Sequence, residues 1–156
     1  MSPKPKSVLR NLHRFGGGIA FVLIASFWLS TIVVELTGST DQIVAVKTAI
    51  AWGLIALIPA LAATGASGFT LARGHIAGIL AVKLRRMKLI AANGILVLAP
   101  CAIGLAMLAN AGQMDGAFVA IQAVELIAGF VNLTLIGLNI RDGLRMRRPA
   151  RSEVHG

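Results

Sequence analysis

The chain has 156 residues, of which 56% are hydrophobic and 13% are charged, and its formal net charge is +9. A soluble domain of this length carries roughly twice that share of charged residues, so the composition argues against a soluble globular protein. The basic residues flank long apolar runs, and we attribute them to membrane topology and to attraction by anionic lipid headgroups rather than to a nucleic-acid partner.

Four segments with little charge follow one another along the chain, at residues 15–36, 45–72, 89–111 and 116–140. Each reaches the about 20 residues that a helix needs to cross ~30 Å of hydrocarbon. Backbone groups in lipid must be paired within the segment, and the alternation typical of barrel strands is missing. The sequence therefore predicts an all-α, polytopic membrane protein, an antiparallel four-helix transmembrane bundle. Its parts are a basic N-terminal segment at 1–14, a transmembrane domain at 15–140 and a basic tail at 141–156.

The first span resembles a secretory signal peptide because basic residues precede its apolar run. That run is longer than the hydrophobic region of a signal peptide, and it ends in Val33, Val34, Glu35 and Leu36 rather than in a cleavage site of small residues. We therefore expect the segment to be retained as a membrane span.

Fourteen of the 15 Lys and Arg residues lie in three blocks, at 4–14, 73–88 and 141–151, and the exception is Lys47, beside another loop. Basic loops favour the cytoplasmic side, so we predict a bacterial cytoplasmic (inner) membrane protein with both termini and the 73–88 loop inside. Apolar residues recur at helical spacing in this loop. It is therefore either a short interfacial helix or an extension of the second or third span.

The fourth span contains the most informative polar pattern. Five polar residues share one helix face, which must turn toward protein or water: Asp115, Gln122, Glu125, Asn132 and Asn139. Glu125 lies roughly 15 Å into the span by the helical rise, close to the bilayer midplane. We expect no Lys or Arg of this chain at that depth, so proton uptake would neutralise Glu125, and any paired cation would come from a partner.

Two interpretations of Glu125 stay open. It is either an acid that handles protons or binds a ligand, or a structural group hydrogen-bonded to Gln122 or, across the bundle, to Ser26. Asn93 of the third span belongs to the same expected intramembrane polar site.

Pro59 and Pro100 lie near the centres of the second and third spans. Each proline removes one backbone hydrogen bond, which produces either a simple kink or a broken helix of the kind that builds transporter sites. Together with Glu125 they predict a small polar cavity.

His13 and His75 are both expected at the cytoplasmic edge, where they are either solvated or the two axial ligands of a haem. Neither these residues nor the single Cys101 has metal-ligand or redox-motif spacing, and no catalytic motif appears. We therefore predict a protein that is not an enzyme, without a metal and, unless haem binds, without a cofactor.

Two resemblances bear on these expectations. Residues 86–100 read RMKLIAANGILVLAP, and the order of basic loop, Asn, Leu and Pro resembles copper-resistance-D-type membrane domains. Spans one and three lack the His or Met pair that would suit copper. With residues 132–143, NLTLIGLNIRDG, the chain resembles small uncharacterised four-span bacterial membrane proteins, which implies the fold and no activity.

The leading functional hypothesis is a small integral membrane subunit or accessory protein that acts through its helix faces, with a membrane-protein partner or as a homo-oligomer. Small residues recur every fourth position in the second span, as helix packing in lipid requires: Ala45, Ala49 and Gly53, Ala56 and Ala60, and Ala62 and Ala66. The alternatives are a proton-coupled or small-solute carrier centred on Glu125, and a redox component that binds haem or copper.

The charge distribution makes a testable topology prediction. A reporter that is active only outside the cytoplasm should be silent when fused after Gly156 or within 73–88, and active near Thr40. A C-terminal fusion that reports an external location would contradict the assignment.

Overall fold

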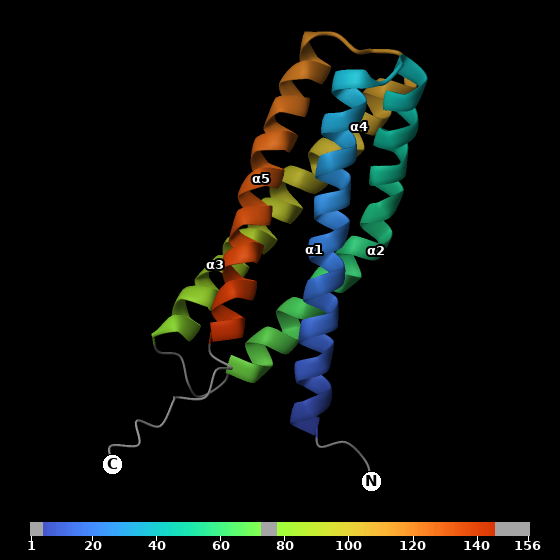
Figure 1. Ribbon diagram of the computed structural model, residues 1–156. Helices are drawn as coiled ribbons and strands as arrows, with labels where there is room; N and C mark the ends of the chain where they lie inside the picture. Colours follow the sequence, from blue (N-terminus) through green and yellow to red (C-terminus); the bar gives the residue numbers. More distant parts are fainter. Residues whose placement is uncertain (1–4, 73–77, 146–156) are drawn as a thin grey trace, which may run out of the picture.

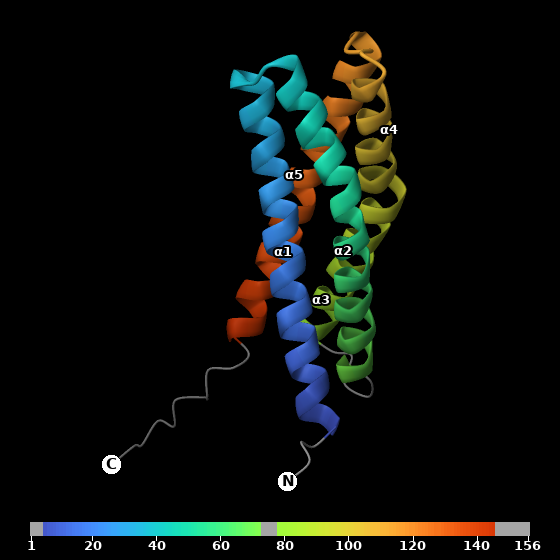
Figure 2. The same ribbon diagram turned by 90° about the vertical axis from the view of Figure 1, so that its right-hand side faces the viewer.

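The computed structural model describes residues 5–72 and 78–145, which are helical apart from short connections and contain no strand (Figures 1 and 2). The elements are α1 (Pro5–Thr37), α2 (Thr40–Ala72), α3 (Ile79–Asn93), the π-helical turn η1 (Gly94–Leu98), α4 (Ala99–Asn110) and α5 (Gly116–Arg145). Because α3, η1 and α4 are continuous, they form one helical rod. The other three rods are α1, α2 and α5. The described chain thus has four helices long and apolar enough to cross a membrane, which confirms the all-α class.

The helices extend well beyond the predicted spans. α1 begins at Pro5, because proline is tolerated in the first helical turn and no helix breaker stands between it and the apolar run. Residues 79–88 belong to α3, so this part of the basic loop extends the third span and is not a separate interfacial helix. Residues 73–77 lie outside the described part of the chain.

The link between α1 and α2 is only Gly38 and Ser39, much shorter than the stretch 37–44 between the first two predicted spans. The backbone N–H of Ser39 donates to Gln42 Oε1 at 2.8 Å, and that of Gln42 donates to Ser39 Oγ at 3.4 Å. This reciprocal arrangement is a capping box, and it starts α2 at Thr40. Consequently Lys47 lies two helical turns inside α2 rather than beside a loop.

The two tight connections lie at the same end of the molecule (Figures 1 and 2). We call this the connection end, and it holds Gly38, Ser39 and the turn at 111–115. Asp115 is used there as a cap, since its Oδ1 accepts the backbone N–H of Ala117 at 3.0 Å. At the opposite end, which we call the basic end, α1 and α3 begin and α2 and α5 finish.

Both prolines are exposed on the outside of the bundle, but the helix geometry around them differs. Pro59 stands inside the continuous helix α2. Pro100 follows the π-helical turn, in which the N–H of Ala99 reaches back to the carbonyl of Gly94. A wide turn immediately before a proline is one way for a helix to accommodate the missing backbone donor.

The core is formed by apolar side chains from all four rods. Its main cluster comprises Ala20, Ile24, Ile50, Leu54, Leu57, Ile90, Ala102 and Ile136, and a second cluster near the connection end contains Leu105, Ala109 and Phe118. Many large apolar side chains face outward instead, among them Phe15, Leu36 and Trp52. Such an apolar exterior needs lipid or another protein to cover it.

Two glycines of α2 provide a matched test of the packing. A Cβ at Gly53 would overlap the ring of Phe27, whereas a Cβ at Gly65 would meet nothing within 4 Å. Gly53→Leu should therefore lower the free energy of unfolding by about 1–3 kcal/mol, and Gly65→Leu should change it little. Unfolding of the purified protein in detergent, followed by circular dichroism, measures both; equal effects would contradict the packing of α1 on α2.

Candidate functional site

The most unusual feature of the interior is a buried ion pair between α2 and α5. Lys47 Nζ lies 2.9 Å from Glu125 Oε2, with the lysine 0% and the glutamate 8% exposed. The same ammonium donates to Thr31 Oγ1 of α1 at 3.3 Å, and the amide of Gln122 donates to Glu125 Oε2 at 3.3 Å. Three of the four rods therefore meet at this pair.

Helix periodicity places both charged side chains inward. Lys47 shares the inner face of α2 with the core residues Ile50 and Leu54. Glu125 lies on the polar face of α5 with Gln122 and Asn132, all of them buried. Glu125 is the tenth of the 30 residues of α5, so the pair lies in the half of that helix nearer the connection end.

The ion pair corrects the expectation about the charge of Glu125. We expected no cation of this chain at that depth, but Lys47 reaches the carboxylate directly. An isolated charge in a low-dielectric interior costs several kcal/mol, and an opposite charge in contact offsets much of that cost. The chain thus contains its own counter-ion for Glu125, without a partner.

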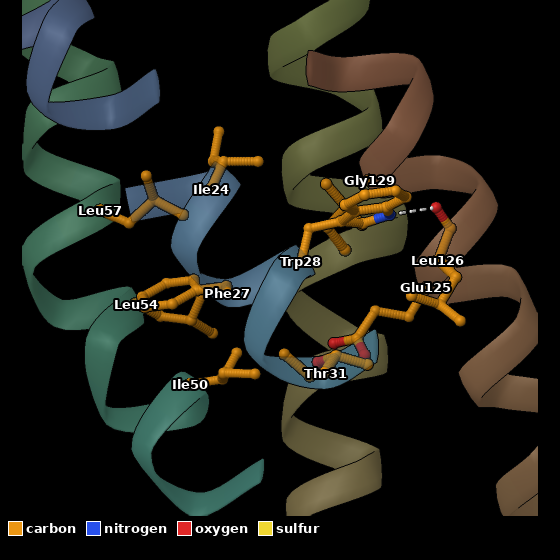
Figure 3. A pocket seen from close by; sticks show the side chains of 12 residues that line it. Ile24, Phe27, Trp28, Thr31, Ile50, Leu54, Leu57, Glu125, Leu126 and Gly129 are labelled. Carbon is orange, nitrogen blue, oxygen red and sulfur yellow. Dashed lines mark hydrogen bonds between the residues drawn. The ribbon is translucent and has the colours of Figure 1, made fainter. Parts of the chain in front are cut away.

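A small cavity of about 50 Å³ lies beside Glu125 and Thr31 (Figure 3). All four rods contribute to its wall, which contains Ile24, Phe27, Trp28, Thr31, Ile50, Leu54, Leu57, Leu98, Ala102, Glu125, Leu126 and Gly129. The prediction of a polar cavity bounded by prolines is wrong in two respects: the wall is almost entirely apolar, and neither proline lines it. Glu125 and Thr31 are its main polar side chains.

Trp28 closes part of this cavity and ties α1 to α5. Its indole N–H donates to the carbonyl of Leu126 at 2.9 Å, as the dashed line in Figure 3 shows. The ring lies against Gly129, where a Cβ would come within 2.8 Å of Trp28 Cδ1. The absent side chain at Gly129 therefore allows the indole to approach the helix backbone.

Asn132 and Asn139, the other polar residues predicted for this site on α5, contact α3 rather than Glu125. Asn93 Nδ2 donates to Asn132 Oδ1 at 2.9 Å, and Asn139 Nδ2 donates to the carbonyl of Lys83 at 3.5 Å. Further along, Arg86 and Asp142 form an ion pair at 2.6 Å. The predicted site thus divides into two groups, with Gln122 at the ion pair and the asparagines nearer the basic end.

Ser26 is the predicted site residue that the structure places elsewhere. It is exposed on the outside of α1, and the nearest α1 partner of the ion pair is Thr31. Thr31 lies five residues further along the helix, so the two hydroxyls point to different sides.

His13 packs between α1 and α2, where its Nδ1 lies 2.9 Å from the carbonyl oxygen of Thr64. Met87 lies beside it, because a Cβ at Gly68 would approach both side chains within 3 Å. His75, the other haem candidate, lies outside the described residues. Within the described ranges no three His, Cys, Asp or Glu side chains gather as a metal site would need. An absorbance spectrum and metal analysis of the purified protein test the redox alternative.

Lys47 is the important residue that the sequence interpretation missed. It is the one Lys or Arg outside the three basic blocks, and this isolation is the signal that could have identified it. Thr31 gives no comparable signal, since a threonine hydroxyl in a span usually donates to a backbone carbonyl of its own helix.

Comparisons with family models, curated proteins and solved structures give no match, so the site is interpreted from its own geometry.

The ion pair predicts a specific pattern of non-additivity. Lys47→Met leaves a buried carboxylate without its cation and should reduce the free energy of unfolding by about 3–5 kcal/mol. Adding Glu125→Gln removes the orphaned charge and should restore most of that loss, while Lys88→Met on the exposed surface should have little effect. Detergent-phase unfolding of the single and double variants measures the coupling; strictly additive losses would show that the two groups do not interact.

Proposed function

We propose that the protein is a multi-pass protein of the bacterial cytoplasmic membrane, folded as an antiparallel four-helix transmembrane bundle with cytoplasmic termini. We further propose that it is a non-enzymatic subunit or accessory protein that binds another membrane protein, or further copies of itself, through its outer helix faces. The basic end carries most of the described Lys and Arg residues, which supports this orientation.

The observation that carries the proposal is the outer face of α2. Of the small residues in the predicted packing pattern, five are exposed, at Ala45, Ala49, Ala56, Ala62 and Ala66. Gly53 and Ala60 are instead used for packing within the bundle, against Phe27 and the core cluster. Exposed small residues at this spacing let the backbone of another helix approach closely, which is the main source of helix association in lipid.

A shallow groove beside this face supports the same conclusion. It runs between α2 and α4 and is lined by Thr48, Ala51, Trp52, Ile55, Ile103, Ala106, Met107 and Asn110. Trp52 and Met107 are each 69% exposed, which is unusual for the largest side chains unless lipid or a partner covers them. An adaptable thioether and a rigid indole are well suited to bind an apolar helix.

Disrupting the small-residue face tests the proposal. The protein purified gently from its native membrane should carry a stoichiometric partner or form a defined homo-oligomer. The double variant Ala49→Leu, Ala56→Leu should lose this association and keep its helicity. The matched control Ala120→Leu, Ala123→Leu alters exposed alanines of α5 and should keep it. A monodisperse single chain in the wild-type preparation, or equal behaviour of both variants, would contradict the proposal.

A second candidate is a proton-coupled or small-solute carrier centred on Glu125, and the cavity beside that residue favours it. In liposomes, Glu125→Gln should then abolish flux of protons or solute while the fold remains intact. Full transport by this variant would exclude Glu125 as the carrier group. Absence of transport by the wild-type protein would leave the subunit proposal unaffected.

A further inference from the structure

Near the connection end, the described acidic side chains are not matched by an equal number of basic side chains. Glu35 of α1 follows Thr31 by one helical turn and therefore shares its face, and Thr31 is the hydroxyl that binds Lys47. The described rods thus bring two carboxylates, Glu35 and Glu125, to the region of a single ammonium. The other described Lys and Arg residues belong to parts of α1, α3 and α5 near the basic end.

Two oxygen atoms in this region lack hydrogen-bond donors. Glu35 Oε1 and Gln122 Oε1 are both buried, and neither has a partner among the described residues. Gln122 is 6% exposed, and it precedes Glu125 by one turn, just as Glu35 follows Thr31 by one turn. Because α1 ends and α5 begins at the connection end, both residues are displaced in the same direction from the ion pair (Figure 1).

The orientation of the Gln122 amide is fixed by its neighbour. Its nitrogen donates to Glu125 Oε2, and the reverse orientation would direct an amide oxygen at a carboxylate. The amide oxygen is therefore held beside the ion pair as an acceptor. Leaving such a buried acceptor unpaired is unfavourable, so a bound donor or cation is expected beside it.

The other ionisable groups of the neighbouring elements do not provide the missing positive charge. Cys101 of α4 is a partly buried thiol, and it can contribute no cation. Asp41 of α2 is exposed and is also an acid, as is Asp115 in the adjoining turn. Two carboxylates and one ammonium therefore leave an excess of one negative charge, and one oxygen of the partly buried Glu35 is shielded from water.

We propose that this cluster binds one additional monovalent cation, a proton or an alkali-metal ion, at the oxygens of Glu35 and Gln122 beside the Lys47–Glu125 pair. The bound cation balances the second carboxylate and satisfies the two unpaired acceptors. The site is independent of the proposed subunit role, since its ligands belong to α1 and α5 and not to the outer face of α2.

Two measurements on the purified full chain distinguish a proton from a metal ion. If a proton is bound, infrared difference spectra in buffers containing only organic cations should show a protonated carboxyl band that disappears as the pH is raised. If an alkali-metal ion is bound, Na⁺ or K⁺ at fixed pH and ionic strength should raise the thermal unfolding midpoint with saturation. Either response assigns the cation.

Glu35→Gln provides the decisive variant, because the amide keeps the size of the side chain and removes the excess charge. It should eliminate whichever response the wild type shows, whereas Asp41→Asn, which alters an exposed carboxyl at the same end, should retain it. Gln122→Met removes the amide oxygen but leaves both carboxylates. It should weaken binding about tenfold or more, as expected for the loss of one contact to a charged group. The proposal is overturned if the wild type shows neither response, or if a response persists unchanged in Glu35→Gln.

Discussion

A lysine ammonium and a glutamate carboxylate in an apolar interior must lie in contact, and this requirement organises the bundle. Lys47 is fully buried, so its position on α2 is tolerated only where Glu125 of α5 and Thr31 of α1 meet it. The contact sets the relative height and rotation of three rods at once. Dispersion contacts between apolar faces are less selective, since a helix in lipid can slide or rotate with little change in buried apolar area.

The rod formed by α3, η1 and α4 is also held by polar contacts to α5. The polar face of α5 binds α2 at Glu125 and α3 along the remainder of its length, and the backbone carbonyl of Leu126 accepts a hydrogen bond from Trp28 of α1. The Asn93–Asn132 contact lies about 10 Å further along the axis from Glu125, by the helical rise. Arg86 and Asp142 fix the two helices again at the basic end. α5 is therefore the element with which α1, α2 and α3 all form polar contacts.

Hydropathy and charge were sufficient to predict four long helices, and the polar spacing was sufficient to predict which face of α5 is buried. Lys47 is missed as the partner of Glu125 when the first connection is taken to be a loop that reaches residue 44. Ser39 and Gln42 form a capping box, and recognising it would have placed Lys47 inside the helix. The contact between Asn93 and Asn132 could not be deduced at all, because it depends on how two separate rods are rotated.

The π-helical turn in the third rod has a consequence for how that rod meets its neighbours. A wide turn holds one extra residue, so the helix faces before and after it are offset by about 100°. α3 packs more extensively on α5 than on α2, and α4 more extensively on α2 than on α5. One continuous helix thus changes its principal neighbour partway along its length. Removing a single residue from Gly94–Leu98 would restore regular winding, and the two halves could then no longer face both partners. The number of residues in this segment is therefore constrained by the need to pack against both α5 and α2.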